Sequence, residues 1–499
     1  MAYTTQIFLF VFFPVCMVLY YVIELLRKLG NPLSKKICMW RISDLILIGL
    51  SACFYMWACF DDVFRLAIYV VVVFIFGHVI EKILQRNTRI VLEFGEDNQQ
   101  RSGLALVYPI FFLMVTILIY ILIRFKYTAL ISKISNFLFR DNVKPKSIMA
   151  PLGISFITFS AISYLADICT NKAKAGSFID CALYLMFFPK MVSGPIILWR
   201  DFSKQLLDRK VTLQQTSDGV TRIMTGFIKK LILADVFGSC IATIPNAVDI
   251  PTAWGVSLLY MLQIYYDFSG YSDIAIGISK MMGFSIKENF HFPYLAYSIS
   301  DFWRRWHISL GTWFREYVYI PLGGNKRGKK KTLLNILVVF LLTGIWHGAG
   351  WTYLLWGVVN GCCNILEKII SQKLWYQKTP KPVKWFVTIT ITFFCWELFR
   401  FEDIAYCIRW LGTMFGCVQF TYIPYSWPYY FDTRMIIFVV IGILGATLLG
   451  LPKIQNISKK IYANQYGYLI CQLALVALFV VAILFMINST YSPFIYFQF

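Results

Sequence analysis

The chain has 499 residues, of which 58% are hydrophobic and 15% charged, and its mean hydropathy is +0.63. Soluble domains average about 45–50% apolar and about 25% charged residues, so the composition excludes an ordinary soluble protein and predicts a lipid-embedded one. The net charge of +21 does not indicate a nucleic-acid partner, because the basic residues lie between hydrophobic segments. There, Lys and Arg typically mark cytoplasmic loops and anionic lipid headgroups.

Several hydrophobic segments are long enough to cross a membrane as helices. A helical span needs about 20 mainly apolar residues, and residues 102–123 and 468–487 meet this requirement without a charged side chain. Residues 7–21 and 148–166 form slightly shorter segments. On this criterion we expect about eleven hydrophobic segments. The chain is therefore predicted to be an all-α, multi-pass protein of the cell membrane.

The part up to residue 139 has the character of a scaffold, because short polar connections separate its hydrophobic segments. From Pro151 onward, glycine, proline, aromatic and ionisable residues appear inside or beside such segments. Residues 184–195 contain an apolar run that is too short to span and ends in two prolines and a glycine. This pattern predicts a re-entrant or interfacial element, which is tolerated at membrane depth only inside protein or beside a water-filled cavity. An internal funnel is expected.

Two carboxylates, Asp267 and Asp273, follow in a largely apolar stretch. Charged side chains are costly in hydrocarbon and usually face a polar interior, so both are candidates for binding substrate. The alternative is structural, since the same carboxylates could cap helices or bind backbone N–H groups beside Gly270. The residues alone leave both interpretations open.

Residues 301–315 combine aromatic, basic and histidine side chains. On one helix, an apolar stripe would face protein or lipid while the arginines point elsewhere. That stripe would contain Trp303, His307, Leu310 and Phe314. Arg304 and Arg305 would then face headgroups or an anionic ligand. Trp303 and both arginines are therefore candidate binding residues.

A long uncharged stretch lies between Lys331 and Glu367, and it exceeds what one bilayer crossing requires. If it is helical from Thr332, His347 lies roughly 24 Å along it, well inside the membrane. Beside His347 are Trp346 and three glycines, residues 344, 348 and 350. The glycines would allow close helix approach or access for a substrate. An ionisable residue in such a segment is a functional candidate by default.

The four histidines of the chain differ in their surroundings. His78 lies near the end of an apolar span and is expected to be structural, and His291 lies in a polar loop and is expected at the surface. For His307, a structural and a functional role are equally favoured, whereas the position of His347 favours a functional role. A neutral imidazole suits general-base work, and burial disfavours its charged form.

The sequence contains no motif that indicates acyl transfer through a covalent acyl-enzyme. No serine lies in a GxSxG elbow, and no Cys/His signature of the covalent acyltransferases occurs. A thioester donor would need no enzyme nucleophile. No metal is expected, since the cysteines and histidines lack metal-ligand spacing. Residues 323–328 do not fit a phosphate-binding glycine loop. They form a basic turn that could attract coenzyme phosphates or lipid headgroups.

Several motifs, taken in this order, resemble the bacterial members of the membrane-bound O-acyltransferase (MBOAT) family. They are residues 151–156, 188–195, 266–273, 302–310, 319–325 and 346–349. Within that family, residues 320–325 resemble the alginate O-acetyltransferase membrane subunit and related polysaccharide O-acetyltransferases. They are less similar to the teichoic-acid D-alanylation protein.

The resemblance implies an MBOAT fold in which spanning, re-entrant and interfacial helices surround a central funnel. From the residues we expect an N-terminal scaffold at 1–139, a catalytic core at 140–370 and C-terminal helices at 371–499, all in one membrane domain. His347 matches the principal histidine of the family and His307 its second one. Asn360 stands where many relatives have histidine, and Lys190 where glutamine is frequent.

The resemblance also implies a reaction. We expect an acyl group, acetyl from cytosolic acetyl-CoA, to reach the funnel beside the basic turn, with His347 as general base and His307 positioning or sharing its proton. An exported partner of the SGNH-hydrolase type would complete transfer to a polysaccharide. The substrate-binding candidates are Asp267, Asp273, Trp303, Arg304, Arg305, Trp346 and Asn360.

Two alternative functions remain open. One is D-alanyl transfer to teichoic acid, which would require a carrier protein in place of coenzyme A. The other is a non-catalytic transporter or polysaccharide-export channel. A transporter would predict internal repeats with paired broken helices, and the motifs instead lie on one side of the chain.

Overall fold

The computed structural model describes residues 3–29, 33–94, 99–128, 131–132, 135–136, 150–206 and 209–488, and every regular element among them is a helix. This confirms the all-α prediction. Seven of the described helices are long and apolar enough to cross a membrane. They are Phe8–Leu26, Phe60–Arg86, Leu106–Lys126, Lys329–His347, Lys381–Arg400, Thr433–Gly450 and Gln465–Asn488. The expected total of about eleven spans stays a prediction.

The contacts divide the chain into two compact units. Unit 1 comprises Met1–Val220 and Ala275–Lys287, and unit 2 comprises Thr221–Ile274 and Glu288–Phe499. Helices α10 (Leu213–Phe227) and α12 (Ile250–Met281) contribute residues to both units. The division into segments at residues 139 and 370, which came from the sequence, stays a prediction.

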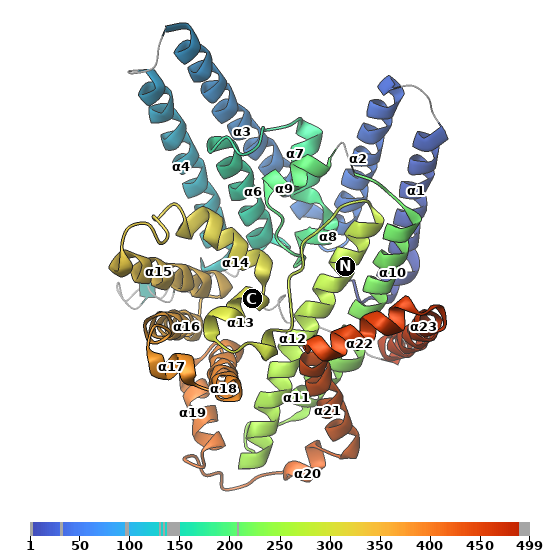
Figure 1. Cartoon of the computed structure of the whole chain (residues 1–499), viewed down its shortest axis with the longest axis vertical. Coiled ribbons are helices and arrows are strands. Elements are labelled where there is room, and N and C mark those ends of the chain that lie inside the picture. Colours follow the sequence, from blue (N-terminus) through green and yellow to red (C-terminus); the bar gives the residue numbers. More distant parts are fainter. Residues whose placement is uncertain are drawn as a thin grey trace. The chain divides into compact units, whose positions relative to one another are not determined.

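Unit 1 is organised around α6 (Ile154–Cys169), in which every residue from position 156 to 169 is buried. The long helices α3 (Phe60–Phe94) and α4 (Gln99–Lys126) run side by side and both pack against α6 (Figure 1). Gly77 allows this packing, because a Cβ atom there would lie 2.4 Å from Cε1 of Tyr164. The other helices of this unit are η1 (Phe8–Phe12), α1 (Phe13–Leu29), α2 (Leu33–Met56), α7 (Phe178–Met186), α8 (Phe188–Met191), α9 (Trp199–Phe202) and η2 (Ser203–Gln205).

The segment predicted to be re-entrant or interfacial forms short helices enclosed by protein. Helix α7 begins at a capping box between Ser177 and Asp180, the chain breaks at Phe187, and α8 follows for one turn. All residues from 180 to 199 are buried. Lys190 is among them, and its Nζ donates a hydrogen bond to Ser160 Oγ over 2.8 Å. Burial lowers the pKa of Lys190 well below its usual value.

Unit 2 holds the remaining helices, most of them after α12. They are η3 (Ile228–Ala234), α11 (Asp235–Thr243), η4 (Pro293–Leu295), α13 (Ile299–Arg305), α14 (Ile308–Phe314), η5 (Arg315–Tyr319), α15 (Lys329–His347), α16 (Trp351–Ile370), α17 (Leu374–Lys378), α18 (Lys381–Arg400), α19 (Ile404–Met414), α20 (Trp427–Tyr430), α21 (Thr433–Thr447), η6 (Leu448–Gly450), α22 (Pro452–Ala463) and α23 (Gln465–Asn488).

The long uncharged stretch forms a hairpin of two helices, α15 and α16, which lie side by side (Figure 1). Glycines allow the close approach, because a Cβ atom on Gly344 would lie 2.4 Å from the Tyr353 carbonyl oxygen. A Cβ atom on Gly348 would lie 2.3 Å from the Tyr353 ring. His347 is therefore the last residue of α15, at the tip of the hairpin.

The expectation of one continuous helix across residues 301–315 is wrong. Helix α13 ends at Arg305, Trp306 is extended, and His307 has φ +44° and ψ +53° before α14 begins. Histidine is one of the residue types that are enriched at positive φ, although such backbone is uncommon outside glycine. The break means that Trp303 and His307 do not share one helical stripe.

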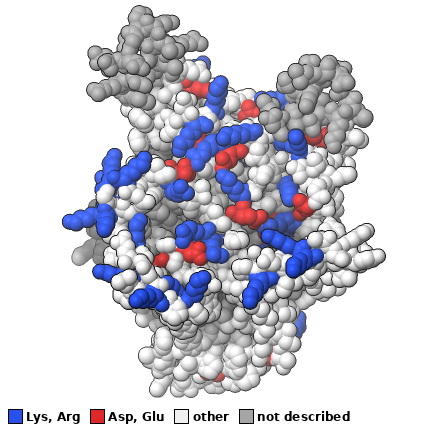
Figure 2. All heavy atoms as spheres, in the orientation of Figure 1, with Lys and Arg blue, Asp and Glu red and all other residues white. Residues whose placement is uncertain are grey.

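Basic residues of unit 2 gather at two places. Figure 2 shows Lys and Arg side chains over the start of α15 and over α22, and few charged side chains over α20 and α21. The first group includes five cations between Lys326 and Lys331, and the second includes Lys453, Lys459 and Lys460. Because such clusters resist translocation, we expect both segments to lie on the cytoplasmic side.

Candidate active site

His307 is held at the start of α14 by a network centred on Asn289. The Asn289 Oδ1 atom lies 3.1 Å from His307 Nδ1 and accepts hydrogen bonds from the Ser309 backbone N–H at 3.2 Å and from Ser309 Oγ at 2.8 Å. The Asn289 amide group donates to Ser272 Oγ of α12 over 3.1 Å. The Asn289 carbonyl oxygen also accepts from the Ile308 N–H at 3.0 Å.

The other side of the His307 ring is enclosed by aromatic side chains. Only 3% of the residue is exposed, and the Phe268 ring lies edge-on with its centroid 4.7 Å away. The His307 Nε2 atom makes no hydrogen bond to any described residue. Burial lowers the pKa of His307 from 6.5 to about 3, because the charged form loses its hydration. The imidazole is therefore neutral at physiological pH.

His347 lies in the same aromatic cluster, which we define as the rings of Trp303, His307, Trp346, His347, Trp356 and Phe399. The residue is 4% exposed. Its ring centroid lies 4.7 Å from Trp346, 4.9 Å from Phe399 and 5.3 Å from Trp356. The Trp346 ring also lies 6.5 Å from the His307 ring. The Trp346 indole therefore lies near both histidines.

Two further candidates, Trp303 and Asn360, lie at the edge of this aromatic cluster. The Trp303 ring packs edge-on against Trp356 at 5.4 Å, and its buried indole N–H has no hydrogen-bond partner among the described residues. Asn360 is buried one helical turn after Trp356 and donates to its carbonyl oxygen over 2.9 Å. The structure thus brings Trp303, Trp346 and Asn360 to the neighbourhood of the histidines.

The two arginines are not part of the aromatic cluster. Arg305 pairs with Asp301 one turn earlier, with Nε 2.9 Å from the carboxylate. The Arg304 side chain is 73% exposed and lies 4.0 Å from the same carboxylate. That the two arginines face headgroups or an anionic ligand stays a prediction.

Asp267 and Asp273 lie on other faces of α12 than Phe268 and are engaged by cations. Asp267 is 2.9 Å from Lys230, which also pairs with Asp235 at 2.5 Å. Asp273 accepts from Arg222 and from Lys229, each at 2.7 Å. This arrangement favours the structural interpretation of the two carboxylates over a role in binding substrate.

The basic turn before α15 depends on glycines with positive φ at positions 323, 324 and 328. The Asn335 amide group stabilises the turn, because it donates a hydrogen bond to the Gly324 carbonyl oxygen over 3.1 Å. The cations around the turn are exposed. They form an accessible positive surface on unit 2.

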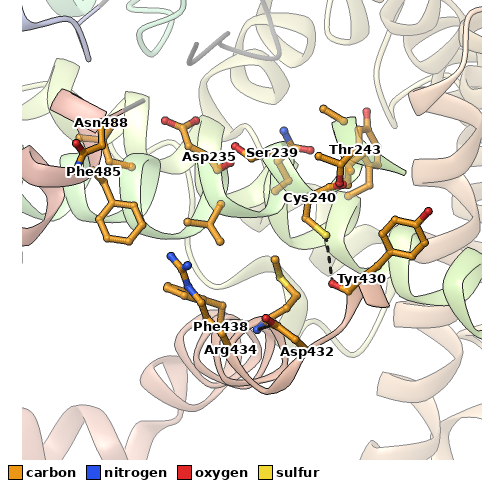
Figure 3. Close-up of a pocket in the computed structure, with 18 of the residues that line it drawn as sticks. Asp235, Ser239, Cys240, Thr243, Tyr430, Asp432, Arg434, Phe438, Phe485 and Asn488 are labelled. Atoms are coloured by element: carbon orange, nitrogen blue, oxygen red, sulfur yellow. Dashed lines mark hydrogen bonds between the residues drawn. The ribbon is translucent and has the colours of Figure 1, made fainter. Parts of the chain in front are cut away.

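A separate cavity of about 1140 Å³ lies in unit 2, between α11 and the helices α21 and α23. In Figure 3 the Arg434 guanidinium points into it, with Phe438 and Phe485 nearby. None of the four histidines lines this cavity. Its lining includes the start of α21 and the end of α23, at the opposite end of these helices from the basic α22. The histidines thus lie in a closed cluster and not in this open cavity.

No group of three or more His, Cys, Asp or Glu side chains that could hold a metal occurs among the residues the structure describes. The carboxylates of α12 are engaged by Lys and Arg, and the histidines face aromatic rings and Asn289. The described side chains around the histidines therefore offer no donor set for a resident metal ion.

Sequence reasoning missed three residues that shape the site. Asn289 occurs in the loop that was considered only for His291, and nothing in its spacing pointed to the histidine that follows much later in the chain. The rings of Phe399 and Trp356 pack against His347. In the sequence, each looks like an ordinary apolar position of a helix. Only a three-dimensional arrangement could reveal them.

Seven described helices long and apolar enough to cross a membrane define an integral, multi-pass membrane protein. Residues 97–401 match the sequence model of the MBOAT, membrane-bound O-acyltransferase family. The match covers more than half of the chain, so the chain belongs to this family. It is thus a multi-pass membrane acyltransferase, as the motifs predicted.

Comparison with characterised sequences places this chain near three kinds of relative. It is 37% identical over 371 residues to the probable alginate O-acetylase AlgI of Pseudomonas putida, covering 70% of this chain and 76% of that protein. It is 32% identical over 328 residues to the peptidoglycan O-acetyltransferase of Helicobacter pylori, covering 58% and 62%. It is 31% identical over 234 residues to the teichoic acid D-alanyltransferase of Streptococcus thermophilus, covering 43% and 56%.

Proposed function

We propose that this enzyme moves an acetyl group from cytosolic acetyl-CoA across the membrane for O-acetylation of a cell-envelope or extracellular polysaccharide. The immediate acceptor is a hydroxyl group, either of the polysaccharide or of an exported partner of the SGNH-hydrolase type. Two relatives support an acetyl donor and a glycan acceptor, since they are named for acetylating alginate and peptidoglycan.

The observation that carries the proposal is that His307 and His347 lie in one aromatic cluster, each near Trp346. In the proposed reaction His347 removes the proton from the acceptor hydroxyl as its oxygen attacks the thioester carbonyl. A C–O bond forms, the C–S bond breaks, and the proton passes from His347 to the departing thiolate sulfur. No covalent acyl-enzyme is needed.

His307 has a different task in this scheme. Its low pKa makes it a poor proton acceptor near neutral pH, so it accepts a hydrogen bond from the reacting hydroxyl and orients it. The surrounding rings exclude water, which would otherwise hydrolyse the thioester.

The donor is proposed to approach from the basic turn of unit 2. Exposed Lys and Arg side chains attract the phosphates of coenzyme A and raise its local concentration. This surface is suitable for a small polyanion, and its five cations within six residues favour the cytoplasmic side.

Purified protein in liposomes tests the proposal. Acetyl-CoA supplied with the exported partner or an acceptor glycan is expected to release free thiol and to yield an acetyl ester, and omission of the acceptor should suppress both. If acetyl-CoA stays inert under these conditions, the acetyl assignment is lost.

D-alanyl transfer is the second candidate, favoured by the similarity to the teichoic acid D-alanyltransferase. In the same liposomes a D-alanyl carrier protein replaces acetyl-CoA. Transfer from the carrier with inert acetyl-CoA would change the substrate and leave the enzyme class intact. A thioester-independent flux of glycan through the liposomes would instead support the export channel.

A further inference from the structure

We infer that Asn289 is a positioning residue that holds His307 in the tautomer with the proton on Nδ1, which leaves Nε2 as a bare acceptor facing the aromatic cluster. The consequence for catalysis rests on the proposed role of His307. The tautomer itself follows from the hydrogen-bond network and can be measured without any substrate.

The first step is the orientation of the Asn289 amide group, whose oxygen and nitrogen must be assigned from their partners. The Ser309 backbone N–H can only donate, and it points at one end of the amide over 3.2 Å. That end must be the oxygen. The amide nitrogen at the other end donates to Ser272 Oγ at 3.1 Å. Both ends of the amide thus have partners of the correct kind.

The second step is the imidazole proton. Because Asn289 Oδ1 is an acceptor, the nitrogen 3.1 Å from it must carry hydrogen. The opposite tautomer would set two lone pairs against each other across that distance in a buried site. Ser309 Oγ lies 3.4 Å from the same nitrogen, but it already has a shorter contact of 2.8 Å with the amide oxygen. In a neutral imidazole, hydrogen on Nδ1 leaves Nε2 without one.

The third step is the rigidity of this arrangement. Asn289 is completely buried, and its carbonyl oxygen fixes the Ile308 N–H at the start of α14. Its side chain is tied to α12 through Ser272, one turn after Phe268, which packs on the His307 ring. The positive φ of His307 is therefore maintained from both sides, by its backbone and by its ring.

Together these contacts explain why a costly backbone conformation occurs at this histidine. Strained residues persist only where the surroundings determine them, and they concentrate at functional sites. The strain directs Nδ1 toward Asn289, so that the opposite nitrogen, Nε2, is left without a partner among the described residues. A bare Nε2 can accept the hydrogen bond of a hydroxyl group, whereas a protonated one could not.

Nitrogen NMR of the histidines tests the tautomer directly. The chain has only four histidines, so ¹⁵N,¹³C-histidine labelling in liposomes gives few signals, and His307→Gln identifies those of interest by their loss. We expect the protonated nitrogen of His307 to be Nδ1 and the bare nitrogen to correlate with Cδ2, which is bonded to Nε2. A protonated Nε2 with a bare Nδ1 would overturn the inference.

Substitutions at Asn289 separate positioning from a merely structural role. Asn289→Ala removes the acceptor, and we expect the Nδ1 proton signal to be lost and acyl transfer to fall about 10–100-fold, as for other partners that orient a functional histidine. Asn289→Asp keeps an acceptor oxygen, so Nδ1 should stay protonated. Asn364→Ala, at a buried asparagine of α16, is the matched control and should leave the His307 signals unchanged.

The outcomes distinguish this inference from the proposed function. If His307→Gln has full activity while the Nδ1 proton is observed, the role of His307 in the reaction is lost and the positioning by Asn289 stands. If Asn289→Ala is folded and retains its Nδ1 proton signal, the positioning is refuted whatever the activity. Should that variant fail to fold, the wild-type spectrum alone decides.

Discussion

Two buried regions of unit 2 handle ionisable groups in opposite ways. On α12, Asp267 pairs with Lys230, and Asp273 pairs with both Arg222 and Lys229. In the aromatic cluster, rings pack against both His307 and His347. The first region pairs its charges, whereas in the second region burial lowers the pKa of His307 and keeps that imidazole neutral.

The difference follows from what each group can do when it leaves water. A buried carboxylate is stabilised only by good ion pairs and hydrogen bonds, and it is then committed to its partners. An imidazole can enter the interior as a neutral molecule and keep a lone pair available. Buried carboxylates near a motif therefore indicate structure when cations engage them, whereas neutral imidazoles indicate chemistry.

The largest expected effect is the loss of acyl transfer on substitution of His347. His347→Ala should leave a folded, membrane-inserted protein and lower acyl transfer by about 10²–10⁴-fold, because the general base is removed. Ester formation in liposomes, normalised to folded protein, measures it. His291→Ala, which changes an exposed histidine, is the control and should retain activity. Wild-type activity of His347→Ala would remove this residue from the mechanism.

His307→Gln should have a smaller effect. Glutamine keeps hydrogen-bonding capacity but cannot act as a base, so a residue that only orients the hydroxyl should leave partial activity, about 10–100-fold below wild type. The same liposome assay applies. Complete loss equal to that of His347→Ala would mean that the two histidines act as a unit, and the division of labour would be wrong.

Substitution of a paired carboxylate should lower stability and leave activity nearly unchanged, the reverse of what is expected for the histidines. Asp267→Asn leaves Lys230, whose side chain is 1% exposed, without one of its two counter-charges. We expect a loss of stability of about 3 kcal/mol, with near-normal activity per folded molecule. Thermal unfolding in detergent measures the first and the liposome assay the second. Asp218→Asn, at a half-exposed pair with Lys280, is the control and should cost at most about 1 kcal/mol. An intact fold without activity would return Asp267 to the substrate site.

The all-helical fold could be predicted from the sequence, because apolar length is a local signal. The hairpin tip at His347 could not, since three glycines within a span are compatible with both a long helix and a turn. The break at His307 was missed for a related reason. Its positive φ is imposed by Asn289 and Ser309, and the contact with Asn289 depends on tertiary structure.

The roles of the charged candidates depended even more on tertiary structure. A sequence shows that Asp267 and Asp273 lie in an apolar stretch, but their partners Lys230, Lys229 and Arg222 come from another helix region. Periodicity gives the face of a helix and not what packs against it. Carboxylates that are paired and carboxylates that await a ligand therefore look the same at the level of the sequence.

The smallest expected effect tests whether His307 is neutral in the folded protein. Its pKa is lowered to about 3 by burial, below the ordinary value of about 6.5 in the unfolded chain. The unfolded chain therefore binds the proton first as the pH falls, and this group destabilises the fold progressively as the pH falls through 6.5, with almost no effect above about pH 7.5. At pH 5.5 the expected loss is about 1.4 kcal/mol.

His307→Gln lacks this contribution, so its unfolding temperature should fall less than that of wild type between pH 7.5 and 5.5. Other titrating groups act on both proteins and cancel in the difference. Equal falls in the two proteins would show that folded His307 takes up the proton as readily as the unfolded chain, and the contrast between a charged and a neutral region of unit 2 would be lost.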